Sequence, residues 1–148
     1  MAPRKRPLAV TCLVILVLIL ATTQLLRAWL ALSTFGFYRE LLGSALPIFL
    51  LLSGLAWAAL GVWLGDSLRR GATWAPQAAR WGFVAFTAFG WLDRLVLQAS
   101  GPQAVNWAFQ LVGTSLLLVM VFAALALPRA QAFFGENDER PLKARRTK

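Results

Sequence analysis

The chain has 148 residues, of which 59% are hydrophobic and 14% charged, and its formal net charge is +9. A soluble domain is about 25% charged and about 45–50% apolar, so this composition excludes an ordinary soluble enzyme and a disordered protein. The single cysteine excludes an internal disulfide, and the lack of histidine removes the commonest ligand of zinc and haem sites. We therefore expect neither a metal ion nor a cofactor.

Four long apolar blocks predict an all-α, polytopic integral membrane protein, built as an antiparallel bundle of four transmembrane helices. About 20 apolar residues at 1.5 Å per residue cross a hydrocarbon core of about 30 Å. We expect a membrane domain over residues 8–128 between a basic N-terminus, residues 1–7, and a charged, disordered tail, residues 129–148. The predicted spans are residues 8–32, 45–64, 76–97 and 105–127.

The first block has a rival interpretation, because Arg4, Lys5 and Arg6 resemble the basic start of a secretory signal peptide. No A-x-A cleavage motif follows the apolar core, since Ile19 stands before Ala21 where a small residue is needed. We therefore expect an uncleaved helix.

Turn-forming and capping residues mark the ends of the other blocks. Ser44 can cap the second helix, which runs past residue 64 to Arg70 and stops at Gly71. Thr73 is a candidate cap for the third helix, and Pro128 ends the fourth. The link between the third and fourth blocks is only a few residues long, so these two helices are expected to be antiparallel neighbours.

The basic residues are distributed unevenly about these spans. With a cytoplasmic N-terminus, twelve of the fifteen fall on the inner side and three, Arg27, Arg39 and Arg94, fall on or near the outer side. This asymmetry predicts a multi-pass protein of the plasma membrane, the bacterial inner membrane, with both termini in the cytoplasm. Because the charges flank apolar spans, we expect them to bind the anionic headgroups of the lipid bilayer, and no nucleic acid. The inner residues are Arg4, Lys5, Arg6, Arg69, Arg70, Arg80, Arg129, Arg140, Lys143, Arg145, Arg146 and Lys148.

Polar side chains inside the apolar blocks are the candidate functional residues. Charges are costly in the bilayer and usually face protein or water, so we expect Arg27 to pair with Asp93 near the outer boundary. Gln24, Asn106 and Gln110 fall at a similar depth and complete the predicted cluster. Such a cluster is a structural clamp or a binding site. The other interpretation is that Arg27 and Arg94 extend separately to the headgroups while Asp93 meets water.

Small residues at helical spacing predict close helix contacts. The second block carries Gly54, Ala58, Gly61 and Gly65, and the third carries Gly82 and Gly90. These stripes serve either packing within the chain or a homo-oligomer.

At the inner ends, Arg69, Arg70 and Arg80 are expected to bind lipid phosphates, with Asp66 within helical reach of the first two. The aromatic loop at residues 33–43 is expected in the outer interface.

The hairpin at residues 61–86 has the sequence GVWLGDSLRRGATWAPQAARWGFVAF. It resembles the short basic hairpin of small, uncharacterised four-helix bacterial inner-membrane proteins, and that resemblance implies a fold and a location but no functional residues.

The chain contains no metalloprotease, serine-hydrolase or phosphate-loop motif, and we expect no enzymatic activity. The favoured function is an interaction or accessory component of the membrane, with a second copy or a larger membrane protein as partner. The alternative is a small-molecule or ion transporter or binder that uses the outer polar cluster.

Overall fold

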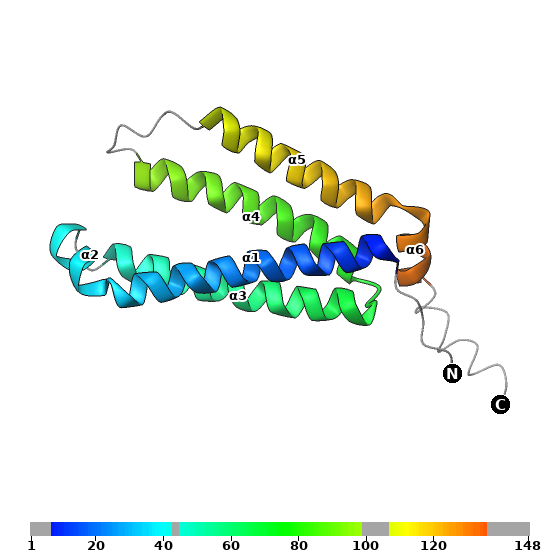
Figure 1. The fold of residues 1–148 in the computed structure, drawn as a ribbon, viewed down its shortest axis with the longest axis horizontal. Helices are drawn as coiled ribbons and strands as arrows, with labels where there is room; N and C mark the ends of the chain where they lie inside the picture. The colour runs from blue at the N-terminus through cyan, green and yellow to red at the C-terminus, as the bar shows by residue number, and fades with distance from the viewer. Residues whose placement is uncertain (1–6, 43–44, 99–106, 136–148) are drawn as a thin grey trace. The chain divides into compact units, whose positions relative to one another are not determined.

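The computed structural model describes residues 7–42, 45–98 and 107–135, which are almost entirely helical (Figure 1). They fall into two compact units: Thr11–Arg70 forms one, and Met1–Val10 with Gly71–Lys148 forms the other. The helices are α1 (Leu8–Ser33), α2 (Phe35–Leu42), α3 (Ala45–Arg70), α4 (Ala75–Gln98), α5 (Trp107–Ala126) and α6 (Pro128–Gly135).

Helices α1 and α3 lie side by side and antiparallel, with their backbones in close approach along a row of small residues (Figure 1). A methyl group built on Gly54 would lie 2.9 Å from the backbone oxygen of Gln24, and one on Gly61 would lie 2.8 Å from Cβ of Ala21. Gly65 faces the side chain of Leu18. The G-x-x-x-G motif of α3 is thus used inside the chain, where close approach gives van der Waals contact that lipid does not replace.

The remaining small residues of the predicted stripes are Ala58, Gly82 and Gly90. Ala58 is buried. A methyl group on Gly90 would meet no atom of the described residues within 4 Å, and its predicted helix contact stays a prediction. Gly82 is half-buried, and its contact stays a prediction.

Helix α3 ends where its sequence indicates. Gly71 has a φ of 71°, in the left-handed region that glycine enters without steric cost. Helix α4 begins at Ala75, one residue before the predicted span: the N–H of Ala78 donates to the carbonyl of Trp74 at 3.0 Å. The cap position is therefore Trp74, and Thr73 precedes it. The candidate cap Ser44 lies outside the described residues.

The aromatic segment expected as a loop is instead the short helix α2, which packs against α3. A turn at Thr34 separates it from α1. The carbonyl of Leu30 accepts hydrogen bonds from the backbone N–H and the hydroxyl of Thr34, at 3.0 and 2.6 Å, and one from the Ser33 hydroxyl at 3.1 Å. These bonds satisfy a carbonyl at the end of α1, where no further helical turn is available.

In the other unit, α4 and α5 are antiparallel neighbours joined at one end, and α6 packs against α5 (Figure 1). Helix α6 occupies the first part of the tail that we expected to be disordered, and residues 136–148 lie outside the described part. Ala130 and Phe134 are buried, and the rings of Phe133 and Phe134 meet edge to face at a centroid distance of 5.2 Å. Alanine and phenylalanine at four-residue spacing supply the apolar face that holds this turn of helix in place.

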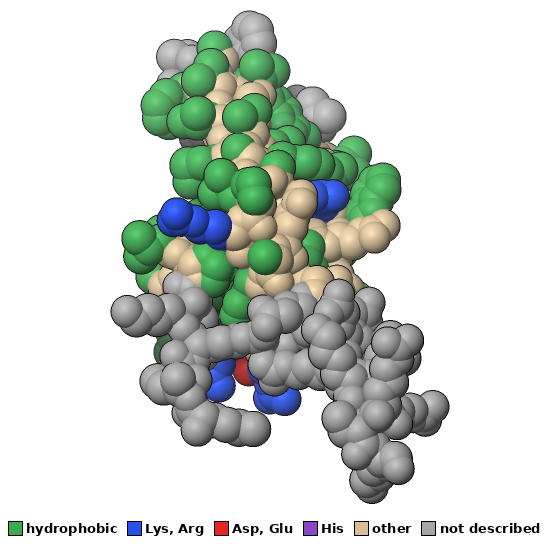
Figure 2. All heavy atoms as spheres, turned by 90° about the vertical axis from the view of Figure 1, so that its right-hand side faces the viewer, with side chains coloured by type: hydrophobic (Ala, Val, Ile, Leu, Met, Phe, Trp, Pro, Cys, Tyr) green, Lys and Arg blue, Asp and Glu red, His purple; other side chains and the backbone are tan. Residues whose placement is uncertain are grey.

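Three of the described helices are long and apolar enough to cross a membrane: α1, α3 and, over Ala108–Ala126, α5. Only 22%, 17% and 11% of their most apolar windows are buried, so most of this apolar surface is exposed. Hydrophobic side chains also dominate the coloured part of the face drawn in Figure 2. Helix α4 has 24 residues, about 36 Å at 1.5 Å per residue, but it is less apolar than the other three.

Hydroxyl groups within the apolar helices donate to carbonyls of their own helix. This arrangement suits a medium without water, because it leaves no donor to be satisfied by solvent. The donors and acceptors, 2.8 to 3.3 Å apart, are Thr22 and Leu18, Thr23 and Leu20, Ser53 and Leu50, Ser67 and Trp63, and Thr114 and Gln110.

The close approach of α1 and α3 gives a direct test. We expect Gly61→Ala to lower the free energy of unfolding by about 1–3 kcal/mol, because the added methyl has no space against Ala21. The matched control is Gly113→Ala on α5, where a methyl meets no described atom within 4 Å and helix propensity favours alanine. The free energy of unfolding of both variants is measured in mixed micelles, by raising the sodium dodecyl sulfate content and monitoring the loss of helix by circular dichroism. Equal stability of the two variants would contradict the close packing.

Candidate functional site: polar groups on the membrane helices

Gln24 and Arg27 lie one turn apart on α1, so their side chains share one side of the helix. Both are half-buried. The side-chain oxygen Oε1 of Gln24 is buried and accepts no hydrogen bond from the residues that the structure describes. In an apolar medium an amide oxygen of this kind favours a donor from another helix or from a bound molecule.

Asp93 and Gln110 lie at the joined end of the α4–α5 pair. Asp93 is in the last two turns of α4 and Gln110 is in the first turn of α5, and both are half-buried. The third predicted member at this end, Asn106, lies outside the described residues. Since Gln24 and Arg27 belong to the other compact unit, the pairing of Arg27 with Asp93 stays a prediction.

A second polar row follows one face of α4 at seven-residue spacing. It consists of Arg80, Thr87 and Arg94, all half-buried. The Nε of Arg80 and the Oγ1 of Thr87 are buried and have no hydrogen-bond partner among the described residues. Thr87 thus differs from Thr22 and Thr114, whose hydroxyls donate to their own helices.

Thr87 was not among the residues predicted from the sequence, although its position midway between two arginines of one helix face was a usable signal. Arg80 was predicted, like Arg69 and Arg70, to bind lipid headgroups. The structure separates them by exposure: Arg80 is half-buried, whereas the side chains of Arg69 and Arg70 are 61% and 74% exposed. Arg80 therefore differs in environment from Arg69 and Arg70 and belongs with the polar row of α4.

The C-terminal end of α3 carries a three-residue charge network. The carboxylate of Asp66 lies 2.7 Å from Nε of Arg70 and 3.6 Å from Nε of Arg69. Spacings of three and four residues place these groups on neighbouring turns.

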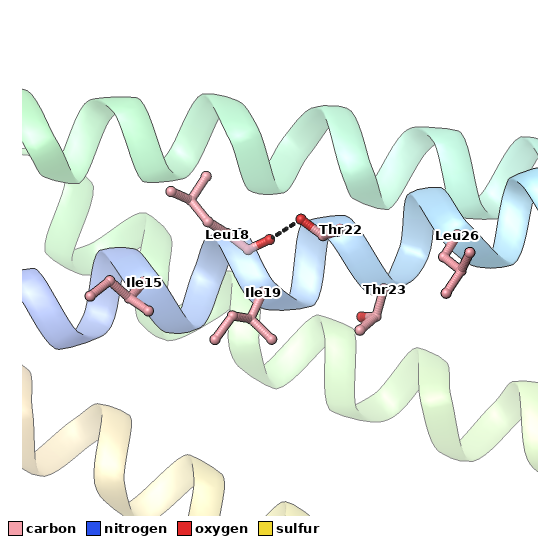
Figure 3. Close-up of a pocket in the computed structure, with 6 residues that line it drawn as sticks. All are labelled: Ile15, Leu18, Ile19, Thr22, Thr23 and Leu26. Atoms are coloured by element: carbon pink, nitrogen blue, oxygen red, sulfur yellow. Dashed lines mark hydrogen bonds between the residues drawn. The ribbon is translucent and has the colours of Figure 1, made fainter.

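Two hollows are found among the described residues of the Thr11–Arg70 unit. One, of about 360 Å³, follows α1 and is lined by Ile15, Leu18, Ile19, Thr22, Thr23 and Leu26 (Figure 3). The other, of about 480 Å³, is lined by residues of α1 and α3 that include Trp29, Leu51 and Leu55. The threonine hydroxyls here already donate to backbone carbonyls (the Thr22 bond is drawn in Figure 3), so the hollows offer apolar contact and little hydrogen bonding.

Within the described ranges, no three histidine, cysteine, aspartate or glutamate side chains are grouped so that they could hold a metal ion. No family model matches the chain, and the comparisons with curated proteins and with solved structures found no match. The resemblance to small four-helix inner-membrane proteins therefore stays a prediction.

Proposed function

We propose that the protein is a multi-pass component of the bacterial inner membrane, with α1, α3, α4 and α5 all crossing the bilayer and both termini in the cytoplasm. Its function is to associate with another membrane protein, either a second copy or a larger partner. Three helices with sufficient length and hydropathy support the membrane location. The twelve basic residues on the expected inner side support the orientation.

The observation that carries the association function is the contrast between α5 and the α1–α3 pair. Helix α5 has only 11% of its apolar window buried, while α1 and α3 already use their small residues against each other. The exposed residues of α5 include Phe109, Leu116 and Val119, at 83%, 63% and 65% exposure. In a bilayer such a face contacts either acyl chains or the side chains of another membrane helix.

Extraction in a mild detergent followed by native mass spectrometry tests this function. We expect the protein to stay with the membrane in a carbonate wash and to be released in a defined complex with a second copy or another membrane protein. Crosslinks from α5 should then exceed crosslinks from the glycine face of α3. A protein recovered only as a monomer with lipid, after gentle extraction and after crosslinking in intact membranes, would contradict the association.

The polar row on α4 favours a second function, the binding and passage of a small anion. Arginine and threonine side chains are rich in hydrogen-bond donors, and a row that holds Arg80, Thr87 and Arg94 would present donors along about 21 Å of helix. Two atoms of this row have no partner among the described residues, and a bound anion or its water would satisfy them.

Chloride efflux from vesicles that contain the purified protein tests this second function. We expect Thr87→Val, which keeps the shape and removes the hydroxyl, to slow efflux at least fivefold. The control is Thr114→Val, because the Thr114 hydroxyl is already bonded to its own helix. Efflux no faster than from protein-free vesicles, or equal rates in the two variants, would exclude the anion path.

A further inference from the structure

The Asp66, Arg69 and Arg70 network has the chemistry of a phosphate receptor held at a membrane boundary. Asp66 interacts with the Nε atom of each arginine, at 2.7 Å for Arg70 and 3.6 Å for Arg69. Each guanidinium also carries two terminal amines, and paired amines of this kind match the two oxygens of a phosphate. With two positive groups and one negative group, the network carries a net charge of +1.

The surroundings of the network place it where lipid headgroups are found. Trp63, Asp66 and Arg70 are spaced by three and four residues and share one face of α3. Trp63 is 57% exposed and lies two turns nearer the apolar part of the helix. Val62, at 56% exposure, stands in the same relation to Arg69. A phosphate at the arginines would therefore have apolar surface beside it for the acyl chains of the same molecule.

We propose that this end of α3 binds the phosphodiester of an anionic phospholipid, with Arg69 and Arg70 as the binding residues and Asp66 as a positioning residue. The inference rests on the proposed insertion of α3 in the bilayer. A zwitterionic lipid presents the same phosphate, but its own ammonium group offsets the charge. Free inorganic phosphate lacks the chains that Trp63 and Val62 would contact.

Lipid titration of the full-length protein by native mass spectrometry tests the proposal. The probes are phosphatidylglycerol, phosphatidylcholine and inorganic phosphate. We expect the Arg69→Gln, Arg70→Gln double variant to raise the dissociation constant for phosphatidylglycerol by roughly thirtyfold, from about 1 kcal/mol for each arginine. Phosphatidylcholine should bind the unmodified protein more weakly than phosphatidylglycerol does, and its dissociation constant should change less in the double variant.

The control is the Arg39→Gln, Arg129→Gln double variant, which removes the same charge from two exposed arginines on α2 and α6. An equal loss in this control would show attraction by net charge and overturn the site. Displacement of phosphatidylglycerol by millimolar inorganic phosphate would also overturn it, because the ligand would then be free phosphate.

Asp66→Asn separates positioning from charge by the sign of its effect. This variant removes one negative charge, so affinity for phosphatidylglycerol rises if charge alone governs binding. Affinity falls if the carboxylate is needed to orient the arginines, and we expect a fall of threefold or more together with lower selectivity over phosphatidylcholine. A rise would overturn the role of Asp66. Retention in the membrane after a carbonate wash is measured in parallel, so loss of the lipid site is distinguishable from failure of membrane insertion.

Discussion

The hydrocarbon layer of a membrane holds no water, and polar atoms placed there must find partners in protein or lipid. This constraint accounts for the helical form of the apolar segments, because each helix satisfies its own backbone. It also accounts for the hydroxyls of Thr22, Ser67 and Thr114, which donate to carbonyls one turn earlier. Helix contact then depends on close packing, and the glycines of α3 allow the backbone of α1 to approach.

The same constraint separates the charged residues into two kinds. Asp66 lies at a helix end and pairs with Arg69 and Arg70, whose side chains are exposed, so these charges stay in a polar environment. Arg80 and Arg94 are half-buried within α4, whose lower hydropathy distinguishes it from α1, α3 and α5. A helix of this kind crosses a bilayer more readily when other helices or polar ligands cover its polar face. If α4 crosses the bilayer, its polar row therefore needs such a cover.

Much of the helical architecture could be predicted from the sequence, because long apolar runs and glycine stops act locally. The end of α3 at Gly71 is an example, since its φ of 71° needs no information from elsewhere in the chain. The short helices were harder to predict. Helix α2 depends on packing against α3, and α6 depends on packing against α5, so neither was indicated by its own eight residues.

Candidate site residues were harder to predict for the same reason. Helical spacing placed Gln24 with Arg27 on one side of α1, but it did not reveal that the Gln24 oxygen is buried. It treated Gly90 like Gly61, although only Gly61 has a neighbour at contact distance among the described residues. Thr87 escaped notice because a threonine in an apolar helix is ordinary until its hydroxyl is found apart from its own backbone. These properties belong to neighbouring elements, which spacing along one helix does not identify.

The central claim is that α4 crosses the membrane together with the three more apolar helices. Cysteine accessibility in intact cells measures this directly, in a Cys12→Ser background with one new cysteine at Ala72 or at Gln103. If α4 crosses, a membrane-impermeant maleimide added outside labels the cysteine at position 103 and leaves the one at position 72 unlabelled until the cells are opened. The same labelling behaviour at both positions would put the two ends of α4 on one side of the membrane and contradict the account.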